Sequence, residues 1–288
     1  MNDRKQTPGV LLILLAALLW STNAPVVRLL SIGGLLAAGL RAFIAGIALL
    51  PFLRPKKLKF GKELLLTLVC FTGVSAGVTV AIKTTSSAIA VGMQYTSPLW
   101  LFLLSLCRGK KPTKKMIVPL AVLSVGVILS MFSRAENVSL SGNLIALSTG
   151  LFFAGMTLFA GKAAGDNPIG LSCLSNLFCG IFLLFLARPS PAELIAMPLS
   201  DWLLLLYLGT IQVGAAYSCY YAGLRFVRPT TAAMLSPLEM ILAPLWTAIF
   251  QHEIPDEVGL IGFSLVVAGV ILEAVRASGD TAADHPVS

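Results

Sequence analysis

Apolar runs of about 20 residues recur along this chain of 288 residues, and they restrict its fold more than any other feature. About 20 apolar helical residues cross the hydrocarbon core of a bilayer, which is about 30 Å thick. Helices suit this environment because they pair their own backbone N–H and C=O groups. The sequence therefore predicts an all-α integral membrane protein with ten transmembrane helices. The ten runs are 9–29, 33–53, 63–82, 86–107, 116–133, 142–161, 169–187, 202–222, 229–250 and 258–276.

The composition excludes two other classes of protein. Hydrophobic residues make up 57% of the chain and charged residues only 12%, whereas soluble domains carry about 25% charged residues. Disordered chains combine low hydrophobicity with high net charge, and the mean hydropathy here is +0.88. The formal net charge of +8 does not indicate nucleic-acid binding, because the basic residues lie in short segments between the apolar runs. There they are typical of membrane topology and of contact with lipid headgroups.

The basic residues also predict the orientation. If the N-terminus is cytoplasmic, 16 of the 21 Lys and Arg residues fall in cytoplasmic segments. Cytoplasmic loops are enriched in Lys and Arg. An even number of spans returns the chain to the same side, so both termini are expected in the cytoplasm.

Signals of enzymatic chemistry are weak. The two histidines, His252 and His285, do not form a metalloprotease motif, and the sequence has neither a phosphate-binding Gly-Lys loop nor a dinucleotide fingerprint. The five cysteines fall inside apolar runs and include no Cys-x-x-Cys pair. We therefore expect no enzyme activity, no cofactor and no metal site.

Two halves of the chain resemble each other. Gly126-Val127-Ile128-Leu129 recurs as Gly269-Val270-Ile271-Leu272, 143 residues later, and Lys83 has a counterpart in Arg225, 142 residues later. Each half holds five spans, so the second half would enter the membrane inverted. Inverted repeats are typical of secondary transporters, whose substrate site lies near the midplane between the repeats. We predict a first repeat over 1–134, a second repeat over 135–278, a central cavity between them and a polar tail over 279–288.

Several motifs in this order resemble the drug/metabolite transporter superfamily, in its EamA-like group with two EamA domains. The resemblance covers roughly residues 9–276. It implies ten helices around a central cavity and transport, often export, of amino acids or related metabolites. Two positions depart from the family pattern, with Met240 where proline commonly follows the glutamate and Lys111 where glutamate is common. The motifs are Leu18-Leu19-Trp20-Ser21, Leu40-Arg41-Ala42-Phe43, Ala81 to Ala88, Thr96-Ser97-Pro98-Leu99, Gly223-Leu224-Arg225, Leu238-Glu239, Ala243-Pro244-Leu245-Trp246 and Glu253.

Glu239 is the only carboxylate deep within a predicted span. A charge at that depth is expensive unless it is paired, faces water or is neutralised. Glu239 is therefore either a ligand for a substrate ammonium or a proton-coupling site, or else it is a structural ion pair. Its natural partner is Arg41 in the second span, at a depth that differs by about 4 Å at 1.5 Å per residue. Arg41 is itself either structural or a ligand for a substrate carboxylate.

Aromatic and polar residues near the middle of spans complete the candidate substrate-binding set. Rings around a bound ammonium would add cation–π attraction. The alternative for each residue is core or lipid-facing packing, or joining of helices by hydrogen bonds. Pro98 and Pro237 are expected to break helices near the site. Tyr217, Tyr220, Tyr221, Trp202 and Trp246 are interpreted instead as interfacial aromatics. The candidates besides Glu239 are Trp20, Asn23, Gln94, Tyr95, Trp100, Phe153, Met156, Gln212 and Ser236.

The sequence thus predicts a secondary transporter of the plasma (inner) membrane that moves a small metabolite, most probably an amino acid, by alternating access. The substrate gradient or an exchange for protons would supply the energy. A non-transporting membrane scaffold is the alternative, and it would have its midplane filled by side chains. Ten spans are enough to enclose a site within one chain, so a monomer is compatible with this prediction.

Overall fold

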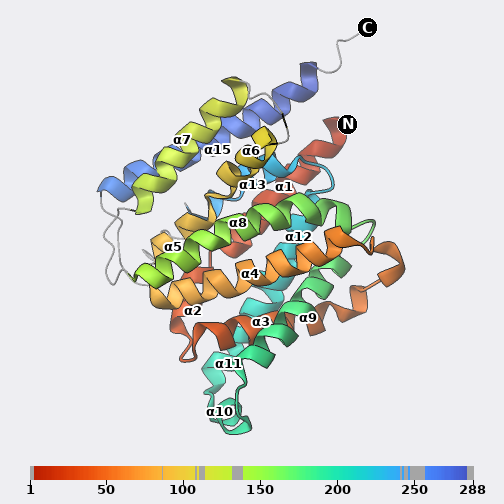
Figure 1. Cartoon of the computed structure of the whole chain (residues 1–288), viewed down its shortest axis with the longest axis vertical. Coiled ribbons are helices and arrows are strands. Elements are labelled where there is room, and N and C mark those ends of the chain that lie inside the picture. The colour runs from red at the N-terminus through yellow and green to blue at the C-terminus, as the bar shows by residue number, and fades with distance from the viewer. Residues whose placement is uncertain are drawn as a thin grey trace.

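Every regular element in the described residues of the computed structural model is a helix (Figure 1). The structure describes residues 3–85, 87–107, 109, 114–131, 139–240, 242, 246 and 257–283. The α-helices are α1 (Asp3–Trp20), α2 (Asn23–Leu29), α3 (Gly34–Leu49), α4 (Lys62–Thr84), α5 (Ser87–Gln94), α6 (Ser97–Cys107), α7 (Lys114–Met131), α8 (Leu140–Ala163), α9 (Pro168–Ala187), α10 (Pro191–Ala196), α11 (Leu199–Tyr207), α12 (Ala216–Gly223), α13 (Pro229–Leu235) and α15 (Glu257–Ala283). Two short 3₁₀ turns, η1 (Leu50–Phe52) and η2 (Pro55–Lys57), and one π-helix, η3 (Leu208–Ala215), join them.

Six helical segments in this part of the chain are long and apolar enough to cross a membrane. They are Thr7–Leu29, Gly34–Phe52, Lys62–Thr84, Leu140–Ala163, Pro168–Ala187 and Leu199–Gly223. The apolar parts of α7 and α15 are shorter, at Ile117–Leu129 and Leu260–Leu272. The predicted fourth span is divided between α5 and α6, and the predicted ninth span extends beyond the described residues. A multi-pass membrane fold is therefore established, while the number ten stays a prediction.

Large apolar side chains cover the outside of the helices. Phe185 is 68% exposed, Val275 66% and Leu144 60%. Water would make such a surface costly, whereas lipid tails solvate it well. The helices therefore present the surface expected of a bundle embedded in hydrocarbon.

Glycines let the helices approach one another closely. A Cβ atom at Gly180 of α9 would lie 2.6 Å from the backbone nitrogen of Phe43 in α3, and one at Gly77 of α4 would lie 2.5 Å from Thr149 Cγ2 in α8. Small residues at such contacts are typical of membrane helix packing, where backbone approach replaces hydrophobic burial. The closely packed pairs are α3 with α9, α4 with α8, α1 with α12, and α7 with α15 (Figure 1).

Gly34, the first residue of α3, allows a stability test with a neighbouring control. A Cβ atom at Gly34 would lie 2.8 Å from Val80 Cα and 2.9 Å from the Thr79 carbonyl oxygen. Since backbone atoms cannot rotate away, we expect Gly34→Ala to lower the free energy of unfolding by about 1–3 kcal/mol. The control, Gly33→Ala, meets nothing within 4 Å and loses only the preference of helix N-caps for glycine over alanine, about 0.5–1 kcal/mol. Thermal unfolding in detergent micelles would measure both, and an equal effect of the two variants would contradict this packing.

Candidate functional site

Three helix interruptions occur beside prolines in the interior of the bundle. The chain leaves helical geometry at Ser21-Thr22 between α1 and α2, at Tyr95-Thr96 between α5 and α6, and at Ser236-Pro237 after α13. Proline has no N–H, so it removes the helical hydrogen bond to the carbonyl four residues earlier. Pro25, Pro98 and Pro237 act in this way. The predicted breaks at Pro98 and Pro237 are confirmed.

A fourth irregularity is the π-helix η3 between α11 and α12. A Cβ atom at Gly209, within η3, would lie 2.8 Å from the carbonyl oxygen of Arg41 in α3, so glycine permits this approach. Short π segments inside α-helices are frequent at functional sites. Seven of the predicted site residues lie in these four irregular segments or within three residues of them. They are Trp20, Asn23, Gln94, Tyr95, Gln212, Ser236 and Glu239.

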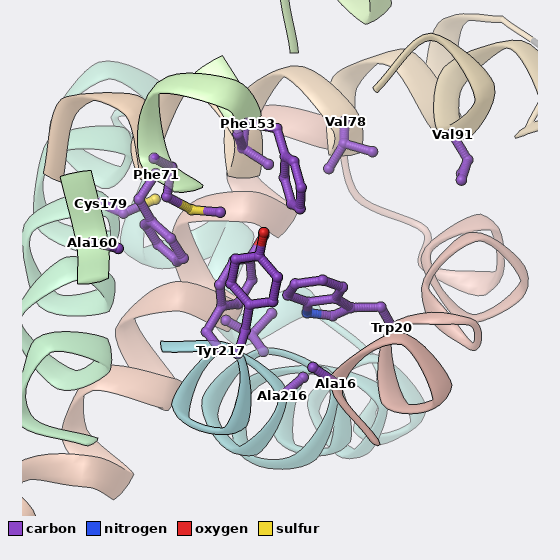
Figure 2. Packing of buried hydrophobic residues seen from close by; sticks show 14 of the residues in the cluster. Ala16, Trp20, Phe71, Val78, Val91, Phe153, Ala160, Cys179, Ala216 and Tyr217 are labelled. Carbon is purple, nitrogen blue, oxygen red and sulfur yellow. The ribbon is translucent and has the colours of Figure 1, made fainter. Parts of the chain in front are cut away.

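Seven rings from five helical segments form one buried group, which we call the aromatic cluster: Trp20, Phe71, Tyr95, Phe153, Tyr217, Tyr220 and Tyr221. The Trp20 ring is its centre, with ring centroids 4.8 Å from Tyr217, 5.1 Å from Tyr220 and 5.9 Å from Phe153. Figure 2 shows Trp20 beside Tyr217, with Phe153 and Phe71 pointing toward them from other helices. The rings meet at tilted or edge-on angles, which aromatic pairs favour.

The interpretation of the α12 tyrosines as interfacial aromatics is wrong. Tyr220 and Tyr221 are fully buried and Tyr217 is 7% exposed. The Tyr220 hydroxyl shares a hydrogen bond of 2.7 Å with Thr157 Oγ1 of α8. Their spacing of i, i+3 and i+4 places all three on one helix face, and that face points into the bundle. Trp246 was also assigned to the interface, but its indole N–H donates to Ser21 Oγ at 2.8 Å, in the break between α1 and α2.

Arg41 is 2% exposed and is held by neutral groups. Its Nη1 donates to Asn23 Oδ1 at 2.6 Å and to Gln212 Oε1 at 3.4 Å, and its Nη2 donates to the Ser75 carbonyl at 3.5 Å. Three segments, α2, η3 and α4, thus converge on one guanidinium. This arrangement brings together three of the residues predicted from the sequence, Asn23, Arg41 and Gln212.

Glu239 is 4% exposed and accepts a hydrogen bond from the Tyr95 hydroxyl. The Tyr95 ring in turn contacts Phe153, with centroids 6.3 Å apart. The expected ion pair between Arg41 and Glu239 is not formed: in the described part of the chain the ion pair present is Arg225–Asp166, at 2.7 Å. The estimate of equal depth gave no information on the direction in which each side chain points.

Buried polar atoms without a partner cluster around these groups. Within the residues that the structure describes, they include Trp20 Nε1, Arg41 Nε, Gln94 Oε1, Ser97 Oγ and Tyr221 Oη. Buried polar atoms are nearly always hydrogen-bonded, so an orphaned set indicates a role beyond packing. These donors and acceptors are available to a polar molecule or to water.

The other predicted residues divide between the cluster and its surroundings. Met156 is fully buried in the same core, and Ser236 Oγ donates to the Ala232 carbonyl at 2.8 Å. Trp100 lies apart, in a small group with Leu101, Ala154 and Ala233. His252, Glu253 and Pro244 lie outside the described residues. The described residues contain no group of three His, Cys, Asp or Glu side chains that could hold a metal ion.

Known proteins share this fold and much of this sequence. A transporter of unassigned substrate from Archaeoglobus fulgidus is 26% identical over 271 residues, 92% of this chain and 95% of its own. The threonine/homoserine exporter RhtA of Escherichia coli K12 is 25% identical over 238 residues, 80% of this chain and 78% of its own. A crystal structure with 18% identity superposes with a TM-score of 0.73 over 94% of this chain and 98% of the other, which shows a common fold.

The family comparison covers almost the whole sequence. The model of the EamA-like transporter family matches twice, at residues 7–132 and 140–274. The resemblance noted from the motifs around Trp20, Arg41 and Glu239 is thereby confirmed. The chain belongs to the EamA-like transporter family, within the drug/metabolite transporters.

Proposed function

We propose that this protein is a secondary transporter that exports amino acids or closely related small metabolites across the plasma membrane by alternating access. The observation that carries the proposal is the convergence of four helix irregularities on one buried group of rings, amides and opposite charges. Broken helices at the middle of a bundle are typical of substrate sites in transporters, because they free backbone and side-chain polar groups. The threonine and homoserine named for the RhtA relatives supply the first substrates to test.

The proposal includes ten membrane spans in two inverted repeats, 1–134 and 135–278. Contacts across α7 and α15 support it, because a Cβ at Gly126 would meet the Val266 nitrogen at 2.6 Å and one at Gly269 would meet Leu123 Cβ at 2.7 Å. Positions 143 residues apart thus exchange partners, as a pseudo-two-fold axis requires. The two helices are antiparallel, since residue numbers rise along one as they fall along the other.

Cytoplasmic termini and a short polar tail over 279–288 complete the proposed topology. The start of α1 and the end of α15 lie at the same side of the molecule (Figure 1). The connection between α3 and α4 lies at one end of the bundle and carries Arg54, Lys56, Lys57 and Lys59. Such basic loops favour the cytoplasmic side. Labelling of single cysteines at both termini in intact cells and in open membrane fragments would test the orientation.

Uptake into proteoliposomes tests the function. The panel is labelled threonine, homoserine, other amino acids and their amine and acid analogues, each measured with and without a pH gradient. Saturable uptake of one class supports the proposal and identifies the substrate. No uptake of any compound by folded, monodisperse protein would contradict transport and favour the scaffold alternative, in which the packed aromatic cluster is simply a core.

A further inference from the structure

The described part of the chain contains three buried charged side chains, Arg41, Asp201 and Glu239. Asp201 is satisfied within the protein, because its Oδ2 accepts from the Ser31 backbone N–H at 3.0 Å and from Ser31 Oγ at 2.6 Å. Arg41 and Glu239 have opposite charges, but neither forms an ion pair within the described residues. A buried charge without an ionic partner is costly, so an unpaired cation and an unpaired anion in one region require an explanation.

Arg41 has donors to spare. A guanidinium offers five N–H donors in a planar fork that matches a carboxylate. Its three printed bonds go to neutral oxygens, two of them at 3.4 and 3.5 Å, and Nε has no partner in the described residues. Asn23 and Gln212 orient the guanidinium without neutralising it. The position is suited to an anionic group that arrives from outside the protein.

Glu239 has acceptors to spare. An ionised carboxylate offers about four lone-pair sites, and the hydrogen bond recorded for Glu239 is the one from Tyr95. That hydroxyl fixes one oxygen and leaves capacity on the other. The position is suited to an ammonium group, which brings three donors.

The aromatic cluster connects the two charges. Asn23, the closest partner of Arg41, follows Trp20 by one helical turn. Tyr95, the partner of Glu239, contacts Phe153, which contacts Trp20. A cation and an anion thus flank one set of rings, where the faces of Trp and Tyr attract an ammonium group and exclude water. This polarity matches a molecule that carries both charges on adjacent atoms.

We propose that Arg41 and Glu239 are the two poles of a zwitterion site, in which Arg41 binds the carboxylate and Glu239 the ammonium group of an α-amino acid. The inference rests on the proposed transport function and adds which charge each residue recognises. A substrate with both groups replaces the missing ionic partners of both residues at once. An amine or an acid alone leaves one buried charge unpaired, which is the stronger source of discrimination.

Competition with labelled threonine uptake tests the assignment. The probes are L-threonine, 1-amino-2-propanol, which lacks the carboxylate, and 3-hydroxybutanoate, which lacks the ammonium group. In the wild-type protein we expect both analogues to compete at least about tenfold more weakly than threonine, because each leaves a buried charge unpaired. Equal competition by either analogue would overturn the inference without any variant.

Two variants give a crossed pattern that loss of folding cannot imitate. In Arg41→Gln we expect competition by threonine to weaken about tenfold or more, while that by 1-amino-2-propanol stays within about threefold. In Glu239→Gln the same holds for threonine, with 3-hydroxybutanoate unchanged. Arg41→Lys keeps the charge without the bidentate fork and is expected to recover part of the loss. Arg54→Gln, at an exposed position, is the control.

The outcomes separate the inference from the function on which it rests. Parallel weakening of all three probes in both variants would assign Arg41 and Glu239 a structural role and overturn the zwitterion site, although transport would stand. No uptake of any compound by folded wild-type protein would overturn both proposals. If Arg41→Gln fails to fold, the wild-type competition ratios and Arg41→Lys decide the question.

Discussion

Replacing Trp20 by alanine is expected to produce the largest loss in this protein, of both stability and transport. The indole is 3% exposed and contacts Phe153, Tyr217 and Tyr220. Truncation removes these contacts and leaves a hole that surrounding helices fill only in part, so the free energy of unfolding should fall by about 3–5 kcal/mol. Transport should fall below detection, because the ring at the centre of the proposed site is gone.

Two further variants separate packing from recognition. Trp20→Phe keeps a ring in the cluster and removes the indole N–H, which has no partner within the described residues. We expect most of the stability to return and the substrate affinity to stay reduced. Trp202→Ala removes a tryptophan that is 36% exposed on α11, and it should leave transport unchanged. Thermal unfolding in detergent and initial uptake rates measure these effects. Normal transport by Trp20→Ala would contradict the proposed place of the site.

The sequence predicted the helical class and most long spans because length and hydropathy alone decide them. It also predicted the breaks at Pro98 and Pro237, since a missing N–H is a local property. The face of each helix was harder to predict. The π-helix η3 adds a residue to a turn and so changes the direction of every later side chain in that span. Tyr217, Tyr220 and Tyr221 follow η3, and their inward face could not be derived from their distance to the helix end.

Site residues were predicted where burial of polarity is unusual, and their partners were not. Asn23, Arg41, Gln212 and Glu239 are polar within apolar runs, and all four are buried. Their pairing depends on how the segments pack around α3, which no single span encodes. The Arg41–Glu239 pair therefore failed as a contact, and the bond from Tyr95 to Glu239 emerged only from the structure. The i, i+3, i+4 spacing of the three tyrosines is the pattern that would have indicated a buried face.

Replacing Glu239 by glutamine is expected to abolish the dependence of transport on a pH gradient. The amide keeps the size of the side chain and can still accept from the Tyr95 hydroxyl, but it cannot take up a proton. A single carboxylate that holds either a proton or a substrate ammonium exchanges one for the other, so export is driven when protons flow in the opposite direction. In proteoliposomes the wild-type rate should therefore rise when the compartment that receives the substrate is made acidic. The Glu239→Gln rate, measured at saturating threonine, should be the same with and without the gradient.

The control for this prediction is Glu257→Gln, because Glu257 is exposed in the first turn of α15 and should leave coupling intact. Unfolding midpoints of both variants should lie close to that of the wild type, since the substitution keeps the volume of the side chain. Full gradient stimulation in Glu239→Gln would exclude Glu239 as the proton site. In the described part of the chain Asp201 would then be the remaining buried acid, and its two hydrogen bonds from Ser31 favour a structural role. Such a result would move the driving force from proton exchange to the substrate gradient alone.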